Sequence, residues 1–273
     1  MPELPEVEAV CRNLRKHAVG ATISSLHIER PRITGANVEQ ALACSSLTKL
    51  DSPTISHIDR RGKNILIHLS TSQTIRIHLR MTGNLYVIPD YRFRPAATSA
   101  WFEFTDGRAL VFQDTRGLGT LTLHSADEIE KLLAKVGPEP LSRQFTAEAF
   151  IESANGVRQP AKIFLMDQRR VAGLGNIYAA EALFAARINP RKPIGDVSRP
   201  KLKALHAAIL AILHDAVKSA VRAYSAPGAF REGEDFATAV YGREAERCHV
   251  CNSVIRRITQ GGRSTYYCPR CQR

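Results

Sequence analysis

The sequence lacks any long hydrophobic run, because no uninterrupted apolar stretch approaches the length of about 18 residues that a bilayer requires. We therefore expect no transmembrane helix and no membrane partner. The chain also lacks the basic and then apolar opening of a signal peptide, since it begins with acids and prolines. Neither an internal repeat nor a low-complexity tract is present. These absences predict a globular protein of the cytoplasm.

Acidic residues are scarce, with 26 Asp and Glu against 38 Lys and Arg, which gives a net charge of +12. The last 31 residues contain no lysine but seven arginines: Arg243, Arg247, Arg256, Arg257, Arg263, Arg270 and Arg273. A non-secreted protein this basic usually binds a polyanion. A solvated basic surface is the alternative explanation. Membrane binding would require a basic amphipathic helix, whereas these arginines lie among cysteines.

Cysteine is also rare, and four of the 6 cysteines form two Cys-x2-Cys pairs separated by 16 residues. This spacing is typical of a four-thiolate zinc ribbon, and two disulfides are a poor alternative in a reducing compartment. We therefore predict one structural Zn²⁺ bound by Cys248, Cys251, Cys268 and Cys271. The other two, Cys11 and Cys44, lie in apolar patterns and are predicted core thiols.

The first half of the chain reads as one helix followed by short strands. A stripe of Val7, Val10, Cys11 and Leu14 predicts a helix over 5–18. Strands are expected at 23–29, 64–69, 74–79, 84–88, 101–105, 110–113 and 120–124. Asp106-Gly107 is a hairpin signal between two of them. Strands at this spacing indicate an antiparallel sandwich or barrel.

Helical patterns dominate the second half, after a linker signal at Gly137-Pro138-Glu139-Pro140. Ser125 with Glu128 resembles a capping box for a short helix before the linker, and Thr146 is a cap after it. Further helices are predicted over 160–168, 176–188 and 198–222. The turn Gly173-Leu174-Gly175-Asn176 suits either an anion clamp or an ordinary helix–helix connection. It does not match a dinucleotide-binding fingerprint.

The opening Met1-Pro2-Glu3-Leu4-Pro5-Glu6 carries chemistry of its own. Removal of Met1 would leave Pro2 with a free secondary amine, whose pKa near 8 leaves a usable neutral fraction at pH 7. Such an amine can attack an electrophilic carbon and form an iminium. Glu3 and Glu6 are adjacent proton donors or acceptors. An ordinary helix start, with proline in the first turn and acids at the positive end of the dipole, explains the same residues.

Together these pieces resemble the formamidopyrimidine-DNA glycosylase and endonuclease VIII family of base-excision repair, over the whole chain. The resemblance rests on PELPEVE at 2–8, RRGKNILIHL at 60–69, HLRMTGNL at 78–85, GPEPL at 137–141, MDQRRVAGLGNIYAAEALF at 166–184, VYGR at 240–243, and the terminal ribbon. It implies an α+β fold with an N-terminal antiparallel β-sandwich flanked by helices, a helical helix–two-turn–helix domain and a C-terminal zinc ribbon. The implied domains are 1–135, a linker at 136–150, 151–239 and 240–273. A monomer in the bacterial cytoplasm or nucleoid is expected.

By that resemblance, the catalytic residues are Pro2, Glu3, Lys63 and Arg263. Pro2 would attack C1′ of the damaged nucleotide, release the base and leave an imine, with Glu3 as general acid or base. β- and δ-elimination would then cut the strand. Lys63 would transfer protons and hold phosphate, and Arg263 would contact phosphate during the δ step. Glu6 resembles a supporting carboxylate.

The resemblance also implies residues that bind damaged double-stranded DNA. Met81 would fill the gap left by a flipped base, and Arg116 would pair with the orphaned base. Phosphate contacts would come from Arg158, Lys162 and Asn176. Without the resemblance, Met81 reads as core and Arg116 as a loop cation.

Three positions depart from the family pattern. Leu118 stands where purine-directed members carry a wedge Phe, and Pro95-Ala96-Ala97-Thr98 replaces a stretch with a DNA-binding histidine, for which Arg92 or Arg94 could compensate. The loop at 226–238 is shorter than the purine-type lesion-capping loop. The Pro-Glu-Leu-Pro-Glu opening favours formamidopyrimidine as the substrate, with 8-oxoguanine as a further one, whereas the short loop favours the alternative prediction of oxidised pyrimidines. A non-catalytic binder of lesions and an RNA-associated zinc-ribbon protein are the competing function classes.

Overall fold

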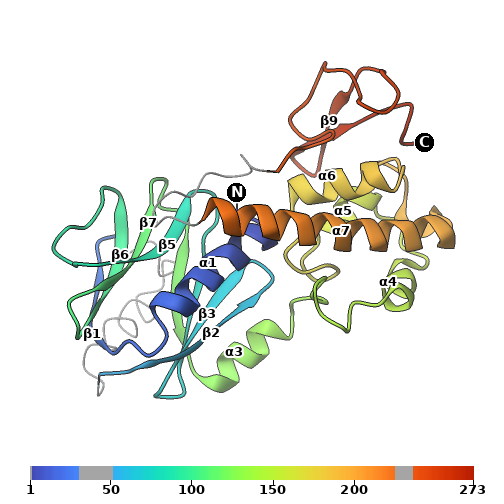
Figure 1. The fold of residues 1–273 in the computed structure, drawn as a ribbon. Coiled ribbons are helices and arrows are strands. Elements are labelled where there is room, and N and C mark those ends of the chain that lie inside the picture. Colours follow the sequence, from blue (N-terminus) through green and yellow to red (C-terminus); the bar gives the residue numbers. More distant parts are fainter. Residues whose placement is uncertain (1, 31–51, 225–235) are drawn as a thin grey trace. The chain divides into compact units, whose positions relative to one another are not determined.

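The structure is a computed structural model that describes residues 2–30, 52–224 and 236–273 (Figure 1). The chain divides into two compact units. The first contains Met1–Lys135 together with the later stretch Ser219–Gly233. The second contains residues from Val136 to Lys218 and from Glu234 to the C-terminus. Each unit is described by itself.

The first unit is built on two four-stranded antiparallel sheets within its described residues. One sheet has the order β1-β6-β7-β5, with β1 Ile23–Ile28, β5 Gly83–Ile88, β6 Thr98–Phe104 and β7 Ala109–Asp114. The other has the order β2-β3-β4-β8, with β2 Ile55–Arg61, β3 Asn64–Leu69, β4 Thr74–His78 and β8 Thr120–His124. Two separate sheets make this a sandwich, not a closed barrel.

A single buried cluster fills the space between the two sheets and reaches helix α1, Leu4–His17. It joins Leu85, Phe102 and Phe112 of one sheet to Ile67 and Ile77 of the other. The expected stripe of α1 also enters it, through Val7, Val10, Cys11 and Leu14. The cluster therefore confirms the core position of Cys11, while Cys44 lies outside the described residues.

Short local signals produce the connections of the sandwich. The Asp106-Gly107 hairpin joins β6 to β7, where the Phe104 amide donates to Arg108 O over 2.9 Å and Gly107 adopts a φ of +88°. Helix α3, Ala126–Leu133, begins with the predicted capping box of Ser125 and Glu128 and contacts β8. Both sequence signals therefore act as predicted.

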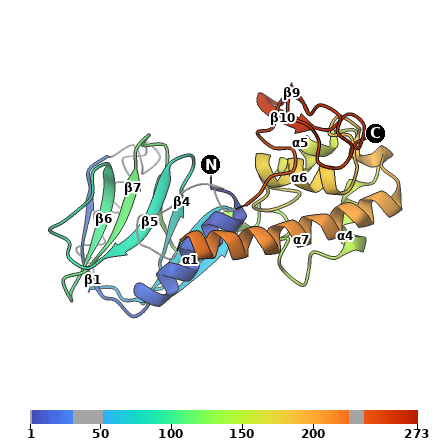
Figure 2. The same ribbon diagram turned by 45° about the horizontal axis from the view of Figure 1, so that its top comes forward.

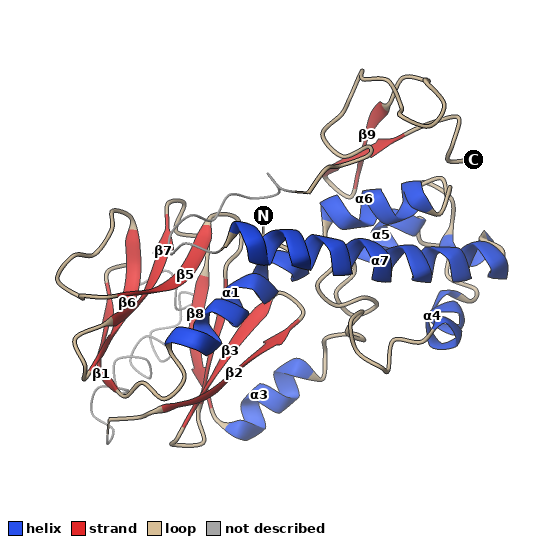
Figure 3. Ribbon diagram, in the orientation of Figure 1, coloured by secondary structure: helices blue, strands red, loops and turns tan. Residues whose placement is uncertain are grey.

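The second unit is helical and ends in a two-stranded hairpin (Figures 2 and 3). Its helices are α4 Ala147–Ala154, α5 Ala161–Met166, α6 Asn176–Ala185, the short 3₁₀ helix η3 Ile194–Asp196, and most of α7 Arg199–Ala223, whose residues from Ser219 belong to the first unit. The hairpin pairs β9, Arg256–Gln260, with β10, Arg263–Tyr267. Thr146 caps α4 as predicted, by accepting a hydrogen bond from the Ala149 amide over 3.2 Å.

Helix α7 is long and apolar enough to cross a membrane by length and composition. Charged residues interrupt it at both ends and at Asp215, so it is not the uninterrupted apolar run that the sequence lacks. Six of its apolar side chains are buried, namely Leu202, Leu205, Ile209, Leu213, Ala216 and Val217. Burial of this stripe is typical of a core helix. At its C-terminal end, Tyr224 is buried in the first unit with its Oη 2.6 Å from Leu85 O.

In the first unit the sequence missed one strand, and in the second it predicted the zinc ribbon without locating its strands β9 and β10. β2 was not predicted because residues 55–61 read Ile-Ser-His-Ile-Asp-Arg-Arg, without clean apolar alternation. A register shift between Ile55 and His57 explains the irregular pattern, since a bulge changes which side chains face the core. The other predicted strands and helices agree with the structure to within three residues at each end.

Candidate functional site

The N-terminus of α1 carries Pro2 and Glu3, and both residues are buried. Glu3 is the N-cap residue, and it forms a capping box with Glu6. The Glu3 amide donates to Glu6 Oε2 over 2.7 Å, and the Glu3 carboxylate accepts from the Glu6 amide. The ordinary helix start weighed from sequence is therefore present. It also fixes the Glu3 carboxylate beside Pro2.

Lys63 lies in the two-residue turn that joins β2 to β3, directly after Gly62. Gly62 adopts a φ of +58°, a left-handed conformation that side chains disfavour and tight hairpins require. Lys63 itself is only 7% exposed. The Arg-Arg-Gly-Lys sequence thus forms a hairpin turn that holds a lysine in a buried setting, unlike a lysine on an open surface.

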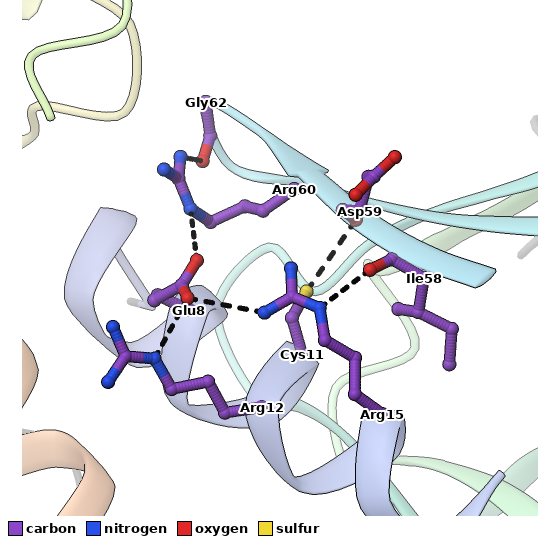
Figure 4. Close-up of polar contacts among 8 residues, drawn as sticks. All are labelled: Glu8, Cys11, Arg12, Arg15, Ile58, Asp59, Arg60 and Gly62. Atoms are coloured by element: carbon purple, nitrogen blue, oxygen red, sulfur yellow. Dashed lines mark hydrogen bonds and ion pairs between the residues drawn. The ribbon is translucent and has the colours of Figure 1, made fainter. Parts of the chain in front are cut away.

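A charge network fixes this turn to α1, and Glu8 is its centre (Figure 4). Glu8 Oε2 accepts from Arg60 Nε over 3.0 Å, and the Arg60 guanidinium donates in turn to Gly62 O over 3.0 Å. Glu8 Oε1 accepts from Arg12 over 3.0 Å and from Arg15 over 3.4 Å. The helix that begins at Pro2 and the turn that carries Lys63 are therefore joined by a bridge of two side chains.

Two further contacts attach α1 to the edge strand β2. Arg15 Nε donates to Ile58 O over 2.7 Å, and the Cys11 thiol lies 3.7 Å from Asp59 O (Figure 4). Burial raises the pKa of Cys11 to about 12, which keeps the thiol neutral. Burial also acts to raise the pKa of Glu8, but the hydrogen bond from Arg12 and the charges of Arg60 and Arg15 outweigh it and lower that pKa.

His78 ends β4 and pairs in register with Asn64, the residue after Lys63. Burial is the main cause that lowers the pKa of His78 to about 3, and the nearby charges of Arg80 and Lys63 lower it further. Its Nδ1 accepts a hydrogen bond from the Arg80 amide over 3.1 Å. The ring is therefore neutral at pH 7, with the proton on Nε2, and it adds no positive charge beside Lys63.

Two loops of the first unit carry the residues predicted to fill the gap that a flipped base leaves in the DNA. Met81 follows β4 and is 39% exposed, in a turn where Arg80 adopts a left-handed φ of +57°. Arg116 and Leu118 lie on the loop between β7 and β8, both exposed, and Leu118 is 47% exposed. Few large apolar side chains are this exposed in the described part of the chain. Met81 is thus a surface residue and not part of the core.

Asp114 holds these two loops together. Its fully buried carboxylate accepts from the Thr82 hydroxyl on one loop, and from the amides of Arg116 and Gly119 on the other, over 3.2 and 2.7 Å. Gly119 is required at its position, because a Cβ there would lie 2.5 Å from the Phe112 ring and 3.1 Å from the Asp114 carboxylate. One carboxylate therefore fixes the backbone beneath Met81, Arg116 and Leu118.

In the second unit, Asn176 and Lys162 both contact the first residues of β10. Asn176 Nδ2 donates to Ser264 O over 3.0 Å. The Lys162 amine donates to the same carbonyl over 2.8 Å and to Thr265 Oγ1 over 2.7 Å. Lys162 is fully buried. The expectation that Lys162 contacts phosphate directly therefore needs correction, because its amine holds the hairpin in place.

Arg263 begins β10 directly beside these contacts, and its side chain is exposed. Arg158, in the irregular segment before α5, is exposed as well. The Gly173–Asn176 turn is a helix connection in which the Gln168 side chain donates to Leu174 O over 2.7 Å and accepts from the Gly173 amide over 2.8 Å. Asn176 is thereby placed at the first position of α6.

The four cysteines predicted to bind zinc converge at the end of the chain. Their sulfur atoms all lie within 4.8 Å of one another, with Cys248 and Cys271 3.9 Å apart and Cys251 and Cys268 3.4 Å apart. A tetrahedral zinc with Zn–S bonds of about 2.3 Å requires sulfurs about 3.8 Å apart. These distances fit one structural Zn²⁺ and are far too long for disulfides, which confirms the predicted cofactor.

Sequence reasoning missed Glu181, which fastens the segment leading into the ribbon. This buried carboxylate on α6 accepts from the amides of Ala239, Val240 and Tyr241 over 2.7, 3.0 and 2.8 Å. It also missed Glu8, His78 and Asp114. Glu8, His78 and Glu181 lie inside segments quoted for the resemblance, but a motif does not state what a side chain contacts, so only the fold shows what these residues bind.

Arg92 and Arg94, the arginines considered as replacements for the lost histidine, both contact neighbouring side chains. Arg92 forms an ion pair with Asp90 at 2.7 Å, and the Arg94 guanidinium lies 4.0 Å from the centre of the Trp101 ring. Both arginines are thus engaged beside the 95–98 segment. The shortened loop at 226–238 lies largely outside the described residues.

Three family models match the chain in sequence order. The N-terminal domain of formamidopyrimidine-DNA glycosylase matches residues 1–121, and the H2TH domain of the same enzyme matches residues 136–225. A zinc finger found in FPG and IleRS matches residues 245–273. The matched segments include every residue of the candidate site and all four zinc ligands.

Curated relatives span the full chain. The chain is 37% identical over 281 residues to a formamidopyrimidine-DNA glycosylase of Streptococcus pneumoniae, covering 100% of this chain and 99% of the relative. It is 39% identical over 280 residues to one of Xanthomonas axonopodis pv. citri, with 100% of both chains covered.

Solved structures agree with these relatives. A Lactococcus lactis FPG mutant in complex with DNA that contains Fapy-dG has a TM-score of 0.87 and 35% identity, with both chains covered completely. The Lactococcus lactis enzyme bound to DNA with an abasic site has a TM-score of 0.86 and 34% identity, with 99% of each chain covered. A wild-type complex with DNA containing an oxidised pyrimidine has a TM-score of 0.87 and 35% identity over both full chains.

Proposed function

The chain belongs to the formamidopyrimidine-DNA glycosylase family, and we propose that it excises oxidised bases through Pro2 and cuts the resulting abasic site. As a member of this family it is a base-excision-repair DNA glycosylase with a zinc finger. Its partner is damaged double-stranded DNA. The proposal concerns which residues perform the reaction and which lesion the protein prefers.

Pro2 acts as the nucleophile after removal of Met1. The ring nitrogen attacks C1′ of the damaged nucleotide, the C1′–N bond to the base breaks, and the departing base takes a proton. The Pro2 nitrogen loses its proton, the C1′–O4′ bond of the sugar ring opens as O4′ takes up a proton, and an iminium forms between the Pro2 nitrogen and C1′. The iminium acidifies the C2′ hydrogen, so loss of that proton expels the 3′ phosphate. A second elimination then expels the 5′ phosphate. Burial of Pro2 favours this chemistry, because desolvation disfavours the protonated and non-nucleophilic amine.

Glu3 and Lys63 supply the proton transfers. Glu3 is held by its capping box directly after Pro2, within reach of the sugar that Pro2 attacks. Lys63 is held in a buried turn beside the neutral His78, and its ammonium would bind a phosphate of the lesion and deliver protons. Arg263 is proposed to hold phosphate in the δ step, and Asn176 and Arg158 to hold the backbone.

The exposed residues of these two loops, Met81, Arg116 and Leu118, take the place of the flipped nucleotide in the DNA. Met81 and Leu118 would enter the vacated stack, which lowers a cost of a few kcal/mol per unstacked step. Arg116, on the same loop as Leu118, would pair with the orphaned base. Asp114 fixes both loops, so the inserted group is held in place before the DNA arrives.

The observation that carries the proposal is the bridge within the first unit. Glu8 and Arg60 join the helix that begins at Pro2 to the turn that presents Lys63. A nucleophile and a proton-transfer lysine from opposite ends of a 60-residue segment are thereby tied to one scaffold. A helix start alone would need no such connection.

The test uses the full chain with its N-terminus either free or blocked. One preparation carries a cleavable N-terminal extension, and the other is cleaved so that its mass confirms Pro2 as the first residue. Each is incubated with abasic-site duplex and borohydride, which reduces an imine to a stable adduct. We expect a covalent complex and strand cutting only from the cleaved protein.

Equal trapping by the blocked protein would overturn the role of Pro2. If the blocked protein does form an adduct, the variant Lys63→Ala tests whether the Lys63 amine is responsible. Loss of that adduct when Lys63→Ala is introduced into the blocked protein would make Lys63 the nucleophile. Salt-dependent binding with uncut strands from the cleaved protein would instead establish a non-catalytic lesion binder. Preference for RNA over abasic DNA in competition would establish the RNA-associated alternative.

The preferred lesion is proposed to be a formamidopyrimidine, with 8-oxoguanine as a further substrate. Oxidised pyrimidines are the second candidate, because Leu118 offers less stacking surface than an aromatic wedge. A duplex panel carrying each lesion, scored for base release and cut ends, separates the two. We further propose a monomer with domains at 1–135, 151–239 and 240–273 joined through 136–150, acting in the bacterial cytoplasm at the nucleoid.

A further inference from the structure

A second group of metal-binding side chains lies on the outer face of the β2-β3 ladder, and no step of the proposed reaction uses it. The group consists of His57, Asp59 and His68. Their ligand atoms all lie within 4.8 Å of one another. Within the described residues, the only other such cluster is the cysteine site.

Strand geometry explains why these three side chains meet. His57 and Asp59 are two residues apart on β2, so they share a face of the sheet. His68 lies directly opposite His57 on β3. The register shift before His57 lets β2 place two polar groups outward while Ile58 enters the core. The cluster therefore depends on β2, the strand that was not predicted from the sequence.

The contact distances suit a shared ion. Asp59 Oδ2 lies 3.5 Å from His57 Nε2 and 3.6 Å from His68 Nε2. A tetrahedral ion with bonds of about 2.1 Å requires ligand atoms about 3.4 Å apart. The two imidazole rings are stacked, with centres 4.0 Å apart and planes 7° apart, so both Nε2 atoms face the same carboxylate oxygen.

One atom of the group is unexplained without a ligand. His68 Nε2 is inaccessible to solvent and makes no hydrogen bond, because its ion-pair partner Asp59 Oδ2, at 3.6 Å, lies beyond hydrogen-bonding distance. Buried polar atoms nearly always have a partner, and an ion is one of the accepted explanations for an exception. The other ring nitrogen, Nδ1, lies 2.9 Å from the Thr74 hydroxyl on β4. A partner of this kind orients the ring of a metal-bound histidine.

We propose that His57, Asp59 and His68 form a binding site for a divalent transition-metal ion. Two imidazoles and one carboxylate favour Cu²⁺, Ni²⁺ or Zn²⁺ over Mg²⁺ or Ca²⁺, which prefer oxygen ligands. His57 and Asp59 are 59% and 57% exposed, so the remaining coordination positions face water. The site is thus an open, exchangeable one, in contrast to the closed cysteine site.

This site is separate from the proposed chemistry. Four ladder positions divide the His57–His68 pair from the Arg61–Asn64 pair that flanks Lys63. At about 3.3 Å per residue this is roughly 13 Å. Loss of metal binding would therefore leave trapping by Pro2 intact, and failure of the trapping experiment would leave the metal site standing.

The test is a calorimetric titration of Ni²⁺ into the zinc-replete, tag-free full chain, with released zinc monitored by a chromogenic chelator. We expect one equivalent of Ni²⁺ to bind without release of zinc. His57→Ala and Asp59→Asn should weaken this binding at least tenfold. His214→Ala, which removes an exposed histidine on α7 outside the cluster, is the matched control and should bind as the wild type does.

Copper gives an independent spectroscopic measurement. The electron paramagnetic resonance spectrum of one added equivalent of Cu²⁺ should contain coupling to two imidazole nitrogens, reduced to one in His57→Ala. Three outcomes would overturn the proposal: no Ni²⁺ binding beyond displaced zinc, binding that persists unchanged in both variants, or binding lost equally in His214→Ala. Both variants replace exposed side chains, and far-ultraviolet circular dichroism checks that each remains folded.

Discussion

The Glu8 network provides a quantitative test of how the first unit holds its candidate site. In Glu8→Gln, the carboxylate that contacts three guanidiniums becomes a neutral amide (Figure 4). Removing one partner of a fully buried ion pair costs about 3–5 kcal/mol. Exposed pairs contribute only about 0.2–1 kcal/mol each. Glu8 is 14% exposed and Gln keeps one acceptor oxygen, so we expect a loss of about 2–3 kcal/mol.

The three partners should not contribute equally. Arg60 is 8% exposed, whereas Arg12 is 51% exposed, although both lie 3.0 Å from Glu8. In double-mutant cycles, the coupling of Glu8 to Arg60 should be about 1.5–3 kcal/mol. The coupling of Glu8 to Arg12, an exposed i,i+4 pair, should be about 0.3–0.5 kcal/mol. Arg12→Gln is therefore the matched control for Arg60→Gln at equal distance.

The assay is urea unfolding followed by tryptophan fluorescence. The chain has one tryptophan, Trp101, and it is buried on β6 of the first unit. Its emission therefore reports the unit that contains Glu8. Equal couplings of about 0.5 kcal/mol for Arg12 and Arg60 would refute the reasoning, because burial would then not decide the strength of the pair.

The pH dependence supplies a second check on the same residue. The folded-state pKa of Glu8 lies below its ordinary value of 4.5. The stability that Glu8 contributes is therefore complete above the unfolded value and is lost as pH falls through the folded value. The difference between wild type and Glu8→Gln should accordingly shrink as the pH falls below 4.5.

Three further predictions concern other groups. Asp114→Asn should destabilise the first unit by about 2–4 kcal/mol in urea unfolding, because the new amide group faces amide donors, and it should slow base release while abasic-site trapping by Pro2 persists. The pKa of His78 is about 3 in the folded state and 6.5 in the unfolded state. The free energy of unfolding should therefore fall as pH drops from 6.5 towards 3, by up to about 1.4 kcal/mol per pH unit. His78→Gln should remove this pH dependence. Cys268→Ser should abolish zinc binding, measured by metal analysis, and weaken DNA binding at least tenfold in anisotropy, whereas Cys11→Ala should retain one zinc per chain.

Local sequence signals predicted most elements because each acts over a few residues. The Ser125–Glu128 capping box, the Asp106-Gly107 turn and the stripe on α1 need no distant partner, and all three formed as expected. β2 was missed because its bulge breaks the two-residue period on which strand prediction relies. The same bulge creates the proposed metal site.

Residue roles were less predictable where side chains act across the fold. Lys162 was expected to face phosphate, and its neighbours in sequence give no sign that its amine is buried against Ser264 and Thr265. Glu181 binds three amides about sixty residues further along the chain. Such partners are chosen by packing, since a buried charge must find whatever donors or acceptors the fold brings to it.

By itself, the sequence determined the zinc ligands, because cysteine spacing carries its chemistry in the chain itself, and the order of its motifs indicated the family and predicted Pro2 as the nucleophile. Tertiary structure decided which groups surround that chemistry: the Glu8–Arg60 bridge, the Asp114 clamp and the meeting of His57, Asp59 and His68. The physical reason is range. Motif spacing and helix or strand periodicity depend on residues that are close in the sequence. The partner of a buried or cross-strand polar group comes from a distant segment, and it is brought into contact only when the chain packs.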